Sequence, residues 1–244
     1  MNIASLIKKA EKKPPRIMVY STPGWGKSTL AASMPSPVFL DIEDGLFGLG
    51  VDTFGVESSY ESVIEHMRAL LQQEHSYKTV VIDTTSELER LIFAQVCKDG
   101  SKNAIEDFGY GKGYVHALDL WDRVLKGLDL LRDKGMAVVL VAHGEIKTIS
   151  SPSFESYDRW VIRLHKAASA RLAEWADCVF FGDHRVTVLA SSDGKRSRGI
   201  GAGQRVLYTE ERPAFLAKSR LDLPFEIDVP KDNGWEAVAL CLGK

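Results

Sequence analysis

The segment from Ser21 to Thr29 reads STPGWGKST and has the residue types of a phosphate-binding loop. A Walker A motif is Gly, four residues, then Gly-Lys-Ser/Thr. Gly26, Lys27 and Ser28 match it, and Ser21 stands in place of the first glycine. Loop N–H groups at a helix start cradle phosphate oxygens. The alternative is a plain Gly/Pro turn. The predicted nucleotide contacts are Pro23, Gly24, Trp25, Gly26, Lys27, Ser28 and Thr29.

Two side chains of this loop have defined chemistry in such a site. Lys27 would reach the β- and γ-phosphates, and the Ser28 hydroxyl would bind Mg²⁺. Asp83 ends the apolar run TVVID, and a carboxylate at the end of a neighbouring buried strand can hold the same ion. Ser28 and Asp83 are therefore the predicted metal ligands.

Glu43 follows a second apolar run, VFLDI, and His143 ends a third, AVVLVAH. A Glu beyond a strand's carboxyl end faces the ligand crevice of an open α/β sheet, where it can orient an attacking water. Asp41 and Asp44 are competitors for that role, and a solvated acidic turn is a further alternative. His143 could contact the γ-phosphate or be an ordinary strand-end histidine. It lacks Cys/His partners at zinc-binding spacing.

Short apolar runs alternate with amphipathic stretches of helical length along the first three quarters of the chain. This pattern is typical of a parallel sheet with crossover helices. After about Phe181, alternating runs predict antiparallel strands on both sides of a Gly-rich basic segment, residues 191–204. The predicted strands are Arg16–Ser21, Val38–Ile42, Thr79–Asp83, Ala137–Ala142, Asp177–Phe181, Arg185–Ala190 and Arg205–Thr209, and the predicted helices are Lys27–Met34, Ser59–Gln73, Ser86–Lys98, Tyr114–Lys134 and Lys166–Trp175.

The 244 residues are 45% hydrophobic and 26% charged, with a formal net charge of −2. This composition excludes long disordered, collagen-like and disulfide-scaffold classes. We expect a flexible basic arm over residues 1–15 and a single domain over residues 16–244. No apolar run is long enough to span a membrane or act as a signal peptide, and three scattered cysteines fit a reducing compartment. We therefore expect a cytoplasmic protein without a membrane partner.

Positive charge is concentrated in residues 185–220, which hold eight Lys/Arg and three acidic residues. Such a segment is either a solvated face or a surface that binds nucleotide or nucleic acid. Aromatic residues that could stack on bases occur in other candidate segments, although Trp160 is expected to pack inside. They are Phe108, Tyr110, Tyr114, Phe154, Tyr157 and Trp160.

The loop, the Glu after the next strand, the strand-end Asp and the polar strand-end residue occur in the order of a RecA-type ATPase core. Further stretches resemble the phage-encoded RecA-like ATP-binding proteins that act in recombination and single-strand annealing. These are FGYGKGY at 108–114, GMAVVLVAH at 135–143, SYDRW at 156–160, LHKAASARLAEWAD at 164–177 and VLYTEERPAFLAKSRLDLP at 206–224. The resemblance implies a RecA-like P-loop NTPase fold: a mostly parallel sheet flanked by helices, with C-terminal antiparallel strands.

The same resemblance implies roles for individual residues. Glu43 matches the catalytic glutamate, and His143 the sensor position, where the RecA group typically has Gln. Lys218 and Arg220 resemble a basic pair that reaches a neighbouring subunit's γ-phosphate, and two solvated cations on a surface strand are the alternative. The basic residues near a DNA-binding loop are Lys147, Arg159, Arg163 and Lys166.

From the resemblance we expect an ATPase that uses ATP and Mg²⁺ and is stimulated by single-stranded DNA. It would assemble into a filament or ring on that DNA, with a single-strand binding protein as a further partner, in the cytoplasm of a phage-infected cell. Two alternatives remain open at this point. One is a nucleotide-gated module that loads another protein onto DNA, and the other is a small-molecule kinase with the same loop.

Overall fold

The structure is a computed structural model that describes residues 13–150, 155–190 and 197–242. Most of the predicted N-terminal arm, Phe154 and the first part of the Gly-rich segment lie outside the described residues. The elements in chain order are β1 Arg16–Ser21, α1 Lys27–Ala32, β2 Pro37–Asp41, β3 Asp52–Val56, α2 Tyr60–Gln72, β4 Thr79–Asp83, α3 Thr85–Asp99, the 3-10 helix η2 Ile105–Phe108, α4 Lys112–Asp133, β5 Ala137–Ile149, β6 Tyr157–Ile162, α5 Lys166–Trp175, β7 Cys178–Ala190, β8 Ser197–Tyr208, β9 Lys218–Ser219, β10 Glu226–Val229 and α6 Gly234–Leu242.

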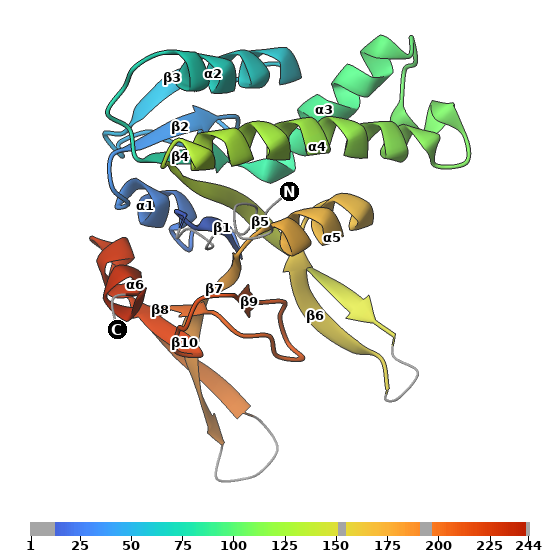
Figure 1. The fold of residues 1–244 in the computed structure, drawn as a ribbon. Coiled ribbons are helices and arrows are strands. Elements are labelled where there is room, and N and C mark those ends of the chain that lie inside the picture. Colours follow the sequence, from blue (N-terminus) through green and yellow to red (C-terminus); the bar gives the residue numbers. More distant parts are fainter. Residues whose placement is uncertain (1–12, 151–154, 191–196, 243–244) are drawn as a thin grey trace, which may run out of the picture.

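One mostly parallel sheet organises the described residues (Figure 1). Its main path runs β10-β8-β7-β1-β5-β4-β2-β3, with β6 paired to β5 and β9 paired to β7. The six strands from β7 to β3 are parallel, and the strands added beyond β7 are antiparallel. The α/β class and the C-terminal antiparallel strands predicted from the sequence are therefore confirmed.

Helices cover both faces of this sheet (Figure 1). Alternate strand residues point to opposite faces, so Met18 and Leu40 contact the layer of α2 to α5, whereas Val19 and Phe39 contact the layer of α1 and α6. The central strands are buried on both sides, as their continuous Val/Ile/Leu runs predict. This packing brings the carboxyl ends of β1, β2, β4 and the parallel part of β5 to one edge.

Two strands continue beyond the parallel sheet as hairpins (Figure 1). After His143, β5 runs on to Ile149 and pairs antiparallel with β6, so that Gly144 lies opposite Ile162. After Gly182, β7 pairs antiparallel with β8. The sequence analysis ended β5 and the first part of β7 too early, because polar residues replace the apolar run where each strand leaves the core.

The elements that the sequence analysis missed include β3, β6, β10 and α6. All five residues of β3 are exposed, so no hydrophobic pattern marks it, and only parallel pairing with β2 at the sheet edge makes it a strand. The strand β10 is four residues long, and α6 is a nine-residue helix that packs on α1. Elements this short have weak local signals and depend on tertiary contacts.

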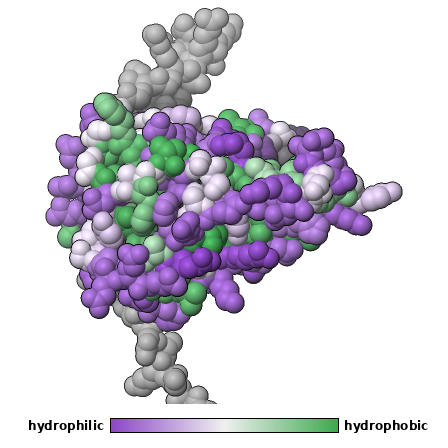
Figure 2. All heavy atoms as spheres, turned by 90° about the horizontal axis from the view of Figure 1, so that it is seen from above, coloured by the Kyte–Doolittle hydropathy of each residue, from purple (hydrophilic) through white to green (hydrophobic). Residues whose placement is uncertain are grey.

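The surface above α2 and α4 is mainly hydrophilic, with smaller hydrophobic patches between hydrophilic side chains (Figure 2). Leu130 of α4 is among the large hydrophobic side chains that are exposed. Among the described helices, none combines the length and the apolar character that crossing a bilayer requires.

A group of ion pairs joins the amino-terminal ends of β1 and β7. Asp177 accepts hydrogen bonds from Arg16 through the backbone N at 3.0 Å and Nη2 at 2.9 Å. Arg132 and Arg220 add ion pairs to the same carboxylate at 3.1 and 3.2 Å. Burial alone would raise the pKa of Asp177, but the arginine hydrogen bonds and charges lower it below its usual value.

Asp177→Asn should lower the free energy of unfolding at pH 7 by about 2 kcal/mol, between the values typical of exposed and buried ion pairs. A carboxyl with a depressed folded-state pKa stabilises the fold above its unfolded-state pKa of 3.8 and loses that contribution as the pH falls through the folded value. The difference between parent and variant in urea unfolding should therefore shrink at pH 3. Asp133→Asn, at an exposed ion pair with Lys13, is the control and should change little. A pH-independent difference would contradict this account.

Candidate functional site: a phosphate-binding cavity at the sheet edge

The turn between β1 and α1 has the backbone of a phosphate-binding loop. Gly24 and Gly26 have φ values of +80° and +101°, in the region that favours glycine. Gly26 is also the residue before the first turn of α1, and Leu30 N donates to its carbonyl at 2.9 Å. We call residues Ser21–Thr29 the phosphate loop.

Lys27 is held inside this loop rather than extended into solvent. Its Nζ donates to Ser21 Oγ and to the Thr22 carbonyl, both at 3.3 Å. Burial lowers the pKa of Lys27, while the nearby carboxylates of Asp83 and Glu43 act in the opposite direction. The contact explains Ser21, the departure from the Walker A pattern: its hydroxyl accepts a hydrogen bond from the lysine of the loop.

The two predicted metal ligands, Ser28 and Asp83, lie together. The Ser28 hydroxyl hydrogen-bonds to the Asp83 carboxyl group, which is buried at the end of β4. Burial raises the pKa of Asp83 to about 6, and the charge of Lys27 opposes this shift. The other carboxyl oxygen, Oδ2, is buried and has no hydrogen-bond partner in the protein.

Glu43 and His143 are in direct contact, although 100 residues separate them. The His143 Nε2 lies 3.0 and 3.1 Å from the two Glu43 carboxyl oxygens. An ionised carboxylate only accepts, so Nε2 carries the proton and donates. Burial lowers the pKa of His143 despite the Glu43 charge, which keeps the imidazole neutral near pH 7. The histidine thus orients the glutamate without neutralising it.

The structure separates Glu43 from its two competitors. Asp41 is buried and accepts a hydrogen bond from Gly45 N at 3.4 Å, so its carboxylate belongs to its own turn. Asp44 has a φ of +56° at the exposed tip of that turn. Of these three acidic residues, Glu43 alone lines the cavity beside the phosphate loop.

That cavity has a volume of about 390 Å³, and we call it the phosphate cavity. Its lining combines the phosphate loop with side chains from the ends of β4 and β5 and from the segment after β2. The lining residues are Pro23, Gly24, Gly26, Lys27, Ser28, Thr29, Glu43, Gly45, Phe47, Leu49, Asp83, Thr84 and His143. Sequence reasoning missed Phe47, whose side chain is fully exposed at this cavity, because one Phe in a Gly-rich turn carries no motif.

Trp25, predicted as a nucleotide contact, packs inside the protein instead. Its indole is buried, and Nε1 donates to the Asp183 carbonyl at 2.8 Å. The ring lies against Gly182, where an added Cβ would stand 2.6 Å from two ring atoms. The Trp25 side chain therefore links the phosphate loop to β7 through packing and a hydrogen bond, and it does not line the phosphate cavity.

Lys218 and Arg220 lie away from the phosphate cavity of their own chain. The Lys218 Nζ donates to the carbonyls of Ala173 and Glu174 at 2.5 and 3.2 Å, near the carboxyl end of α5. Arg220 binds the Asp177 carboxylate and the Glu174 carbonyl. Both cations thus have partners within their chain at the opposite edge of the sheet. Their action on a neighbouring subunit stays a prediction.

The four predicted DNA contacts divide into two kinds. Arg159 is mostly buried and binds Glu211 and the Phe215 carbonyl, so it holds β6 in place. Lys147, Arg163 and Lys166 are exposed. Burial lowers the pKa of His165, and the positive charges of Lys166 and Lys147 lower it further. The positive charge of Arg163 likewise adds to the lowering, by burial, of the pKa values of Lys27 and His143. Arg163 therefore lies close to the phosphate cavity.

The aromatic residues predicted to stack on bases differ in their exposure. Tyr110 is fully exposed, whereas Trp160 packs on the core, with its ring centroid 5.9 Å from that of Phe181. The expected internal packing of Trp160 is confirmed. Tyr114 stacks on His165 at 4.1 Å, beside the exposed lysines.

A family model described as an AAA domain matches residues 13–221. The chain belongs to this family. Its match covers the phosphate loop, Glu43, Asp83 and His143, so the protein is a nucleotide-binding domain of the P-loop NTPase type. No curated protein matches the chain. The narrower resemblance to phage RecA-like proteins stays a prediction.

Gly182→Ala should displace Trp25 and loosen the phosphate loop of this AAA domain, because the new Cβ overlaps the indole. We expect the free energy of unfolding to fall by about 1–3 kcal/mol, as in other overpacked cores. Binding of a fluorescent ATP analogue should weaken in parallel. In the Trp25→Ala background the same glycine substitution should cost far less. Additive effects in this double-mutant cycle would show that Trp25 and Gly182 act independently.

Proposed function

We propose that this AAA domain is a Mg²⁺-dependent ATPase. The observation that carries the proposal is the convergence of Lys27, Asp83, Glu43 and His143 on one cavity beside the phosphate loop. Backbone N–H groups of the loop and the Lys27 ammonium bind the phosphates of ATP. Their positive charge stabilises the charge that develops during phosphoryl transfer.

The residues present fit Mg²⁺. The buried Oδ2 of Asp83 lacks a partner, and the Ser28 hydroxyl lies against the same carboxyl group. Mg²⁺ typically takes one or two protein ligands and completes its shell with phosphates and water. Among the described residues, no group of three or more His, Cys, Asp and Glu side chains could hold a metal ion. When bound, the ion neutralises phosphate charge.

Glu43 supports hydrolysis rather than binding alone. Its carboxylate orients a water for in-line attack on the γ-phosphorus and accepts a proton from it. The bond to the bridging oxygen breaks, and ADP and phosphate leave. His143 orients the Glu43 carboxylate through the Nε2 hydrogen bond. Removing such a group typically slows the chemical step by about 10²-fold or more.

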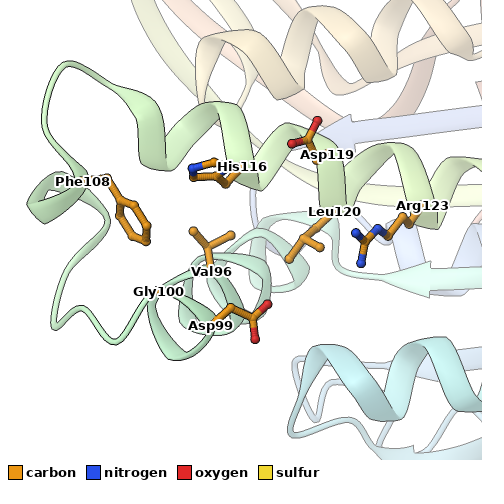
Figure 3. Close-up of a pocket in the computed structure, with 8 residues that line it drawn as sticks. All are labelled: Val96, Asp99, Gly100, Phe108, His116, Asp119, Leu120 and Arg123. Carbon is orange, nitrogen blue, oxygen red and sulfur yellow. The ribbon is translucent and has the colours of Figure 1, made fainter.

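The cavity near α3 and α4 bears on the kinase alternative (Figure 3). It has a volume of about 290 Å³ and is lined by residues between Val96 and Arg123, including Phe108 and His116. It shares no lining residue with the phosphate cavity. A kinase acceptor must meet the γ-phosphate, so this cavity does not serve as its pocket. This cavity therefore gives the kinase alternative no support.

Phosphate release from ATP and Mg²⁺, without any added acceptor, tests the proposal. The parent should turn over ATP, and Lys27→Ala should not, because it lacks the cation that meets the β- and γ-phosphates. Glu43→Gln should bind ATP and hydrolyse it about 10²-fold more slowly. Asp44→Asn, one residue away and outside the cavity, is the matched control and should behave as the parent. Normal turnover by Glu43→Gln, with a large loss in Asp41→Asn or Asp44→Asn, would move the role to another carboxylate.

We further propose single-stranded DNA as a partner, in keeping with the resemblance. Three exposed cations, Lys147, Arg163 and Lys166, support this proposal. Arg163 lies close to the phosphate cavity, and Lys147 forms an exposed ion pair with Glu145 at 2.8 Å. Two of the three cations flank the stacked Tyr114–His165 pair, which offers an aromatic surface to bases. Arg159 is excluded from this set, because its guanidinium is mostly buried and binds both Glu211 and the Phe215 carbonyl.

Lys147→Ala/Lys166→Ala should weaken binding to single-stranded DNA and reduce its dependence on salt. Each lost phosphate contact lowers the slope of log K against log salt by about 0.7. Lys98→Ala is the control, since it removes one exposed charge at the far end of α3. Fluorescence anisotropy with an ATP analogue present measures both slopes. If the parent protein shows no binding at low salt, the DNA proposal is wrong, whatever its ATPase activity.

A further inference from the structure

A cavity of about 670 Å³ lies between α2 and α4, and we call it the α2–α4 groove. Ile64, Met67 and Leu71 of α2 give it an apolar base, and Gly127 lines it from α4. An added Cβ at Gly127 would stand 2.6 Å from Met67 Cε, so the two helices approach each other closely at that point. The groove shares no lining residue with the phosphate cavity.

Charged side chains border this apolar base. Glu61, Glu65, Arg68 and Arg123 line the groove and are exposed. Leu130, three residues after Gly127 on α4, is 48% exposed and extends the apolar surface. Figure 2 shows hydrophobic patches among hydrophilic side chains on this face. An apolar centre with a charged rim is typical of a surface that another segment covers.

The described part of the chain begins beside this surface. Lys13 Nζ donates to Asp133 Oδ1 at 2.6 Å, and the Pro14 carbonyl accepts from Arg132 Nε at 2.6 Å. Both partners lie at the carboxyl end of α4. Residues 1–12, which lie outside the described residues, are therefore tethered there. Twelve helical residues span about 18 Å, whereas Gly127 is only about 9 Å from Asp133 along α4.

The sequence of residues 1–12 has apolar residues at helical spacing. Ile3, Leu6, Ile7 and Ala10 recur at intervals of three and four and share one side of a helix. Pro14 would end such a helix. Isolated helices of this length are marginal in water, so this one needs a surface on which to bury its apolar side.

The spacing of these apolar residues matches the groove. For a helical segment that runs parallel to α4, we count back from Lys13 and Asp133 at the same rise per residue. Ile7 is then level with Gly127, and Ile3 is level with Arg123. Both α4 residues line the groove. The apolar side of the segment therefore meets the apolar base.

We propose that residues 1–12 form an amphipathic helix that covers the α2–α4 groove of their own chain. Ile3, Leu6 and Ile7 pack on the base of the groove, and Lys9 and Lys12 on the opposite side face solvent. The basic arm expected from the sequence is then a docked part of the domain. This inference does not depend on the proposed ATPase function, because the groove lies outside the nucleotide site.

Hydrogen–deuterium exchange of the full-length protein, read by mass spectrometry, tests the helix. The amides of residues 6–12 should exchange at least about tenfold more slowly than in a free peptide of the same sequence, because a docked helix protects its hydrogen bonds. Leu6→Glu places a charge on the apolar side and should abolish this protection. Ser5→Glu makes the same change on the opposite side and is the matched control, which should keep it.

A change in the groove tests the docking site. Ile64→Glu should also abolish the protection of residues 6–12, and slow exchange in β1 and β4 of the same sample shows that the variant is folded. Ile146→Glu, at an exposed position on β5, is the control and should leave the protection unchanged. Because the segment binds its own chain, its protection should not change over about a hundredfold range of protein concentration.

Three results would overturn the inference. The first is fast exchange of residues 6–12 in the parent. The second is protection that survives Leu6→Glu or a folded Ile64→Glu, since the apolar side or the groove would then not be involved. The third is protection that disappears on dilution, which would place the segment on a second copy of the chain. If Ile64→Glu does not fold, the comparison of Leu6→Glu with Ser5→Glu decides.

Discussion

The buried ammonium group of Lys27 is the constraint on which the site depends. A cation out of water is stable only with compensating oxygens and charges. Ser21 and Thr22 supply two oxygens, and the carboxylates of Asp83 and Glu43 oppose the loss of its proton. These partners come from β1, β4 and the segment after β2. The parallel sheet satisfies the lysine because it brings those strand ends to one edge.

The same charge balance explains why acidic side chains surround a site for an anion. Burial raises the pKa of Asp83, and Lys27 opposes that shift, so each group makes the other's charged form less costly. An arriving Mg²⁺–nucleotide brings both signs of charge and fits this mixed lining. His143 orients the Glu43 carboxylate through a hydrogen bond. It adds no positive charge near pH 7, because burial lowers its pKa.

Strands β7 and β8, in the C-terminal part of the chain, contact the phosphate loop through Trp25. Trp25 fits against Gly182 and donates to Asp183 on β7, while Arg205 of β8 binds the Trp25 carbonyl. The antiparallel strands are therefore more than an extension of the sheet edge. On the other side, β5 carries His143 and then continues into the hairpin with Lys147, so one strand joins the phosphate cavity to the exposed cations.

The sequence by itself determined the parallel core and the phosphate loop. Continuous apolar runs mark strands that are buried on both faces, and Gly-Lys-Ser after such a run is a local pattern. The placement of Lys27, Ser28, Asp83 and Glu43 follows from that pattern and the strand ends. Exposed β3, short β10 and the hairpin parts of β5 and β7 have no comparable signal, because long-range backbone pairing forms them.

Only the tertiary structure decided which predicted side chains reach the cavity. Trp25 lies inside a motif yet faces β7, and Lys218 and Arg220 bind carbonyls and Asp177 at the opposite edge. Arg205, far along the chain and in no motif, contacts the loop. Local spacing defines what a residue can do chemically. Its neighbours depend on how strands distant in sequence pair and on which face of the sheet each side chain occupies.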